Sequence, residues 1–251
     1  MKILAVDVGT GTQDILLYDS THEIENCLKL VMPSPTMLVA GAIRRATRER
    51  QPILLTGATM GGGPSAWAAE DHLRAGLKVF ATPAAARSFN DELSEVEKMG
   101  IRVVADDEAA RLADVTRVEM RDFYLAQIER AFEAFGITLD VDAYAVAVFD
   151  HGNSPPGYSD RRFRFDFLAD AIRAEGRLTA FSFLREQIPP RMTRMLAVAA
   201  SVQTDLPVLV MDTAPAAIVG ALEDPRVRAM TRALIVNAGN FHTLAFHLGD
   251  G

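Results

Sequence analysis

The chain has 251 residues, of which 49% are hydrophobic and 24% are charged, and its formal net charge is −7. This composition is typical of a folded soluble protein with one large or two small domains. The negative charge argues against nucleic acid or an anionic membrane as a partner. A single cysteine, Cys27, excludes an intrachain disulfide and any site that needs several thiolates from one chain. The chain opens with a strand pattern and has no apolar run of about 18 residues, so we expect a cytoplasmic protein without a signal peptide or membrane span.

The first predicted element is a β-hairpin. Two short apolar runs, Ile3–Val6 and Ile15–Tyr18, are bounded by turn residues and read as its strands. Gly9 and Gly11 fall in the connection, where we expect them to adopt positive φ and to leave backbone N–H groups accessible.

The turn of this hairpin carries polar groups suited to a phosphate. The hydroxyls of Thr10 and Thr12 could join the backbone N–H groups around phosphate oxygens, and Asp7 could bind a hydrated Mg²⁺. The same residue types also build turns that bind nothing, so a purely structural turn is the alternative.

A third strand and a helix are expected next. Glu23–Val31 is predicted as a strand that ends at Pro33-Ser34-Pro35, and Thr36 is predicted to cap a helix over Met37–Arg50. Three antiparallel strands followed by a helix would begin a mixed α/β domain.

From residue 52 the pattern becomes that of parallel βαβ units. The strands predicted there are Pro52–Thr56, Leu77–Ala81 and Ile101–Val104. Gly61, Gly62 and Gly63 precede Pro64, which suits the first position of a helix, so they could hold an anion at a helix N-terminus. The segment matches neither the dinucleotide fingerprint nor the P-loop, and a flexible turn is the alternative.

The second half of the chain continues with alternating strands and helices. The predicted strands are Val115–Met120, Ala143–Phe149 and Val208–Met211, and the predicted helices are Phe123–Phe135, Met192–Val202 and Ala214–Leu222. Asp150 follows a strong strand, where ligands often bind, although a loop or helix cap is the favoured interpretation. Arg161, Arg162 and Arg164 are interpreted as a solvated helix face, with contact to an anionic substrate as the minor alternative.

The opening hairpin has a copy near the end of the chain. Residues 233–248 can be laid over it without a gap, so that Val6-Asp7-Val8-Gly9 aligns with Val236-Asn237-Ala238-Gly239. Two hairpins of one design, in two domains, could face each other across a cleft.

DVGTGT in the first hairpin and NAGNFHT in the second resemble the pair of phosphate motifs of the actin, sugar-kinase and heat-shock-chaperone ATPase superfamily. The resemblance implies ribonuclease-H-like α/β domains with a mixed sheet, and ATP with Mg²⁺ between them. Residues 1–204 would form the first domain with inserted βαβ units. Residues 205–251 would begin a second copy, which we expect to be truncated at Gly251.

The same resemblance implies roles for individual residues. The tract 212–221 is similar to the sugar-kinase segment in which an Asp deprotonates the substrate hydroxyl, which would make Asp212 the general base and Asp7 the Mg²⁺-organising acid. The phosphate-binding residues would be Gly9, Thr10, Gly11, Thr12, Asn237, Gly239, Asn240 and Thr243. Two positions depart from the superfamily pattern, because Asp14 stands where a Lys or Arg is usual and Asn237 where Asp is common.

More narrowly, the chain resembles a family sometimes labelled pyruvate formate-lyase activating enzyme. That label implies radical chemistry with an iron–sulfur cluster held by a CxxxCxxC motif. Since Cys27 is the only cysteine, we do not expect this chemistry.

Three functional hypotheses follow. The first is an ATP-binding phosphotransferase or ATPase that acts on an unknown small molecule, which the loops around Gly61–Gly63 and Asp150 could contact. The second is a nucleotide-responsive binding or scaffold protein with little turnover, which Asp14 and Asn237 favour. The third is a metabolic α/β enzyme whose site lies at Gly61–Gly63 and Asp150, with purely structural hairpins. No pattern indicates an oligomeric state.

Overall fold

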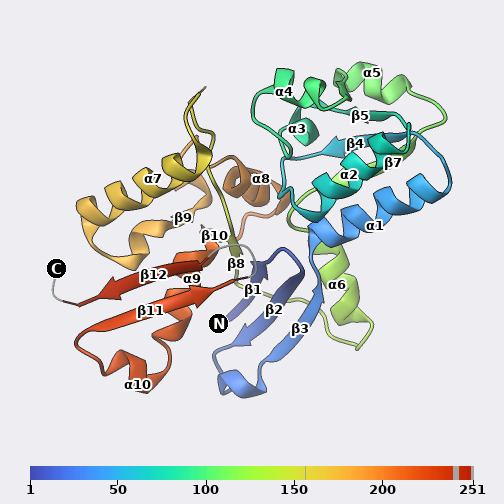
Figure 1. Ribbon diagram of the computed structural model, residues 1–251. Coiled ribbons are helices and arrows are strands. Elements are labelled where there is room, and N and C mark those ends of the chain that lie inside the picture. Colours follow the sequence, from blue (N-terminus) through green and yellow to red (C-terminus); the bar gives the residue numbers. More distant parts are fainter. Residues whose placement is uncertain (156, 240–242, 250–251) are drawn as a thin grey trace.

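The computed structural model describes residues 1–155, 157–239 and 243–249, and it is an α/β structure with two sheets and a separate hairpin (Figure 1). The strands are β1 (Lys2–Val8), β2 (Thr12–Asp19), β3 (Leu28–Pro33), β4 (Ile53–Gly57), β5 (Val79–Ala81), β6 (Ile101–Val103), β7 (Thr116–Met120), β8 (Ala143–Val148), β9 (Ser182–Leu184), β10 (Val208–Met211), β11 (Ala233–Ala238) and β12 (Thr243–Leu248). The α-helices are α1 (Pro35–Arg48), α2 (Pro64–Arg74), α3 (Pro83–Ala86), α4 (Leu93–Lys98), α5 (Asp106–Arg111), α6 (Leu125–Glu133), α7 (Asp160–Glu175), α8 (Thr193–Ser201), α9 (Thr213–Ala221) and α10 (Pro225–Arg228). Short 3₁₀ turns lie at Ile24–Asn26, Leu178–Phe181 and Arg185–Gln187.

The larger sheet is mixed and has six strands in the order β3-β2-β1-β8-β10-β9. β1, β2 and β3 pair antiparallel, β8 and β10 run parallel to β1, and β9 is antiparallel to β10. The predicted opening hairpin is therefore confirmed. Leu4, Val6 and Val8 alternate into a core that also includes side chains of α6 and α8, as the period of two along a strand requires.

The smaller sheet has four parallel strands in the order β6-β5-β4-β7. The parallel βαβ pattern predicted from residue 52 is confirmed. Ile53 and Leu55 on β4 are fully buried in a core shared with α1 and α2, which lie beside this sheet (Figure 1). The chain enters this part through α1 and returns to the larger sheet at β8.

Two predicted boundaries near residue 30 are corrected. The helix α1 starts at Pro35 and is capped by Ser34, whose hydroxyl accepts a hydrogen bond from the Met37 N–H, so Thr36 is not the cap. Pro35 fits the first helical position because its fixed φ matches the helix. The third strand is shorter than predicted, since the residues before Leu28 form a 3₁₀ turn.

The C-terminal hairpin repeats the register of the first. Asp7 pairs with Asp14 across β1 and β2, and the residues 230 positions later, Asn237 and Leu244, pair across β11 and β12. β11 and β12 form a separate two-stranded sheet. The predicted division at 204/205 falls between α8 and β10, and β10 still belongs to the six-stranded sheet.

Among the described residues, no helix combines the length and the apolar character that a membrane crossing requires.

Candidate functional site

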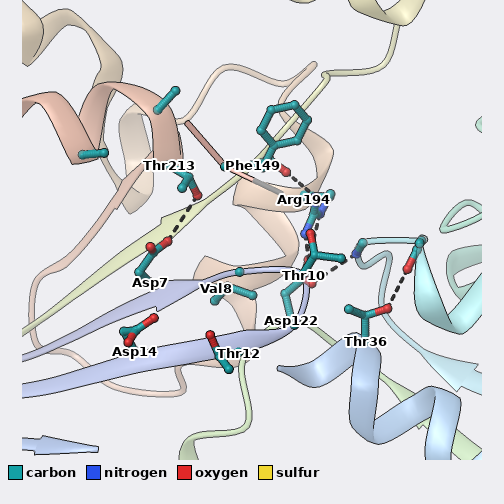
Figure 2. Close-up of a pocket in the computed structure, with 18 of the residues that line it drawn as sticks. Asp7, Val8, Thr10, Thr12, Asp14, Thr36, Asp122, Phe149, Arg194 and Thr213 are labelled. Carbon is teal, nitrogen blue, oxygen red and sulfur yellow. Dashed lines mark hydrogen bonds and ion pairs between the residues drawn. The ribbon is translucent and has the colours of Figure 1, made fainter. Parts of the chain in front are cut away.

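A cleft of about 550 Å³ opens where three glycine-containing segments meet. The β1–β2 turn forms one wall, the loop Gly61–Gly63 before α2 forms another, and Asn237 and Gly239 at the end of β11 contribute a third. The N-terminus of α9 also contributes to the lining. Figure 2 shows the β1–β2 turn reaching between Asp7 and Thr213 on one side and Thr36 on the other. Segments distant in sequence thus converge on one hollow.

The β1–β2 turn, which we define as Gly9–Gly11, is shaped by close backbone contacts. A Cβ on Gly9 would lie 2.6 Å from the Thr12 carbonyl oxygen, so a larger residue does not fit there without a shift. The Thr10 carbonyl accepts a hydrogen bond of 2.6 Å from Ser34 Oγ, which ties the turn to the start of α1. The expected positive φ at Gly9 and Gly11 is wrong, because both glycines keep negative or extended backbone.

One end of the cleft carries two carboxylates. Asp7 and Asp14 face each other across the hairpin, and Thr213 Oγ1 donates a hydrogen bond of 3.4 Å to Asp7 Oδ1. The cleft leaves part of Asp7 accessible, but desolvation of its carboxylate by the surrounding protein raises its pKa to about 6. The negative charge of Asp14 adds to this rise, and the hydrogen bond from Thr213 opposes it. A cation would relieve this repulsion, so this pair could hold a hydrated Mg²⁺.

The other end of the cleft carries an arginine that sequence analysis missed. Arg194 on α8 makes a two-pronged ion pair with Asp122, with Nε–Oδ2 at 2.9 Å and Nη2–Oδ1 at 3.1 Å, and its Nη1 donates to the Phe149 carbonyl. Figure 2 shows this cluster beside the tip of the β1–β2 turn. The ion pair joins residues 72 positions apart, so no local pattern could have revealed it.

The glycine loop is anchored from three sides. Thr36 Oγ1 donates to the Gly62 carbonyl at 2.6 Å, and the Gly61 N–H donates to Asp122 Oδ1 at 3.1 Å. Ser65 Oγ also donates to the Gly62 carbonyl, at 3.0 Å. Gly63 has φ of 58°, a conformation that favours glycine, immediately before the helix begins at Pro64. The predicted helix start at Pro64 is confirmed.

Most of the predicted phosphate-binding residues line the cleft. They are Gly9, Thr10, Gly11, Thr12, Asn237 and Gly239, together with Asp7. Thr243 is exposed and does not line it, and Asn240 falls outside the described residues. Gly61, Gly62 and Gly63, predicted as a separate substrate contact, lie in the same cleft.

Asp212 lies behind the cleft and not in its lining. Its Oδ1 accepts hydrogen bonds from Arg164 Nη2 at 2.7 Å and from the Ala214 N–H at 3.0 Å, so it caps α9 while paired with a buried guanidinium. Arg164, predicted on a solvated face, is 4% exposed and its Cζ lies 3.9 Å from the Phe149 ring centroid. That prediction was wrong because the i,i+3 and i,i+4 pattern of α7 places Arg164 inward with Phe167 and Leu168.

Asp150 also lies behind the cleft and has structural partners. Its carboxylate accepts hydrogen bonds from the Gly152 N–H at 2.8 Å and from the Met195 N–H in the first turn of α8 at 3.0 Å. Burial raises the pKa of Asp150. The alternative of a loop and helix cap therefore describes Asp150, and it does not lie with the Gly61–Gly63 loop.

The described residues do not fit an iron–sulfur cluster. Cys27 is buried, with Sγ 3.7–3.8 Å from the carbonyl oxygens of Glu23 and Asp19. No group of three or more His, Cys, Asp or Glu side chains that could hold a metal ion occurs in the part of the chain that the structure describes.

Comparison with known proteins gives a family. Residues 60–251 match the sequence model of the family described as "Putative pyruvate format-lyase activating enzyme (DUF1786)". No curated protein matches the chain. The matched segment includes the glycine loop, Asp122, Arg194 and the second hairpin, whereas the first hairpin precedes it. Because the match covers most of the sequence, this chain belongs to the DUF1786 family.

Proposed function

We propose that the chain is an ATP-binding phosphotransferase or ATPase of the actin and sugar-kinase type that acts on a small molecule. The observation that carries the proposal is the convergence of the β1–β2 turn, the Gly61–Gly63 loop and Asn237 on one cleft. Backbone N–H groups of glycine turns and a helix N-terminus are the groups that proteins use to bind phosphate.

The strand arrangement supports a ribonuclease-H-like domain. Three antiparallel strands, β3, β2 and β1, continue into the parallel strands β8 and β10. The second hairpin copies the register of the first, and Asn237 occupies in it the position that Asp7 occupies in the first. Both features agree with the superfamily resemblance of the two hairpins.

The residues of the cleft would bind the Mg²⁺ and the phosphates of Mg·ATP. Asp7 and Asp14 would hold Mg²⁺, and the bound ion would neutralise phosphate charge. The hydroxyls of Thr10 and Thr12 and the turn N–H groups would bind phosphate oxygens, with the Asn237 amide opposite them.

One observation favours the alternative of a nucleotide-responsive binding or scaffold protein with little turnover. A general base must reach the proton that it removes. Asp212 is instead 5% exposed and paired with Arg164, and it would have to leave this partner to act on a substrate in the cleft. Its role as the base stays a prediction.

Calorimetry with Mg·ATP tests the nucleotide site. We expect the wild-type chain to bind, Asp7→Ala to weaken binding at least tenfold, and Asp140→Ala, an exposed carboxylate outside the cleft, to bind like wild type. The nucleotide site is excluded if the wild type does not bind or if Asp7→Ala binds equally well.

Single-turnover assays with ATP and candidate hydroxyl compounds separate the two functions. The phosphotransferase or ATPase is supported if the wild type forms phosphorylated product or hydrolyses ATP and Asp212→Asn does not, provided that the variant still binds Mg·ATP. Binding without product supports the scaffold.

A further inference from the structure

Arg194 brings a positive charge to the cleft. Among the described residues that line it, Arg194 is the one Lys or Arg side chain. Its guanidinium reaches so close to the glycine loop that a Cβ on Gly61 would lie 2.7 Å from Nη2. Gly61 therefore leaves the space that Arg194 occupies, and the charge reaches the wall of the cleft.

The hydrogen bonds to Asp122 and Phe149 hold the Arg194 guanidinium in place but do not use all of its N–H donors. Asp122 accepts from Nε and from Nη2, and the Phe149 carbonyl accepts from Nη1. A guanidinium carries two N–H bonds on each terminal nitrogen, so Nη1 and Nη2 each keep one donor with no acceptor within the described chain. A planar fork held in this way is suited to a carboxylate or phosphoryl group.

The glycine loop adds donors beside Arg194. The Gly61 N–H is held by Asp122, and the Gly62 carbonyl is held by Thr36 and Ser65. Within the residues that the structure describes, the Gly62 and Gly63 N–H groups have no acceptor. Asp122 thus positions the arginine and the loop together.

The two ends of the cleft favour ligand groups of opposite charge. Asp7 and Asp14 have no arginine partner among the described residues, and they favour a cation, whereas Arg194 and the glycine loop favour an anion. We propose that Arg194, positioned by Asp122, binds the terminal anionic group of the ligand, while the Mg²⁺-bound part lies at Asp7. The identity of this ligand rests on the proposed function.

The anionic group has two sources with one chemistry. It is either the γ-phosphate of ATP or the phosphoryl group of a second substrate. Binding of Mg·ATP, Mg·ADP and inorganic phosphate separates these sources. Trp67, the single tryptophan of the sequence, lines the cleft and reports binding by its fluorescence.

The variants are chosen to preserve the fold. Arg194→Met alone leaves the buried Asp122 carboxylate without its cation, so the double variant Arg194→Met with Asp122→Asn removes both charges. Arg194→Lys keeps a charge but loses the fork. Arg191→Met, three residues earlier and outside the cleft, is the matched control. Thermal unfolding of each variant verifies its fold.

We expect the double variant and Arg194→Lys to weaken binding at least tenfold for the ligand that carries the anion, and Arg191→Met to stay within twofold of wild type. A loss for Mg·ATP that spares Mg·ADP identifies the γ-phosphate. A loss for inorganic phosphate that spares both nucleotides identifies a second substrate.

Unchanged affinities in the double variant, or an equal loss for every ligand, would overturn the role of Arg194. If wild type binds phosphate through Arg194 but no nucleotide, the proposed function fails while this inference stands. If wild type binds none of the three ligands, both are overturned.

Discussion

At the scale of single residues, the carboxylates in and behind the cleft differ in whether an arginine neutralises them. Asp122 and Asp212 are buried, and each has an arginine within 3 Å, so their charges are compensated inside the protein. Asp7 instead faces Asp14 across the hairpin. A like charge nearby disfavours the ionised form of a carboxylate. Holding the two carboxylates together therefore costs free energy unless a bound cation neutralises them.

Asp7 is therefore expected to make stability depend on pH. Its pKa is raised from 3.8 to about 6 in the folded chain, so the folded state holds this proton more tightly than the unfolded state. The stability that Asp7 contributes is complete below about pH 4 and is lost as pH rises through 6. Asp7→Asn should match wild type near pH 4 and be more stable above pH 7, as measured by urea unfolding across this range.

The control for this experiment is Asp140→Asn, an exposed carboxylate away from the cleft. The interpretation fails if Asp7→Asn shifts stability equally at pH 4 and pH 8, because a constant shift reflects packing and not ionisation.

At the scale of elements, the β1–β2 turn depends on its two glycines in different ways. Gly9 is needed because the Thr12 carbonyl approaches it closely, whereas a Cβ on Gly11 would meet nothing within 4 Å. The sequence predicts positive φ at both glycines alike. The distinction comes from how β2 folds back against the start of the turn.

The two glycines provide a matched pair of substitutions. Gly9→Ala should destabilise the chain by about 1–3 kcal/mol, since the backbone must shift to relieve the contact with Thr12. Gly11→Ala should change stability by less than about 1 kcal/mol, because the alanine fits and only restricts the unfolded chain. Chemical denaturation of both variants measures the difference, and equal effects would contradict the assigned geometry.

At the scale of the whole molecule, the two hairpins differ in how they are supported. β1 lies between β2 and β8 in the six-stranded sheet, with Leu4 fully buried. β11 and β12 pair with each other, and one face of this hairpin is only half-buried, with Phe246 against the buried Phe181. A two-stranded sheet whose inner face is only half-buried has little independent stability.

Hydrogen exchange is expected to separate the two hairpins. Amides in β11 and β12 should exchange at least tenfold faster than those in β1, because local opening there exposes little apolar surface. Mg·ATP should slow exchange at Asn237 if this hairpin binds the nucleotide. Equal protection of the two hairpins without ligand would contradict this expectation.

Local sequence patterns predicted most of the strands and part of the cleft. Short apolar runs bounded by turn residues predicted β1, β2, β8 and β10, and the gapless repeat predicted that Asp7 and Asn237 occupy equivalent positions. These features depend on short-range patterns, in which side-chain direction follows directly from residue spacing.

Which polar residues meet depends on the packing of the whole molecule. It brought the Gly61–Gly63 loop to the β1–β2 turn, placed Arg194 on Asp122, and turned Arg164 inward to hold Asp212 behind the cleft. These pairings join residues 48 or more positions apart in the sequence. Their partners are chosen by the packing of whole sheets and helices, and the cost of burying an unpaired charge keeps them together.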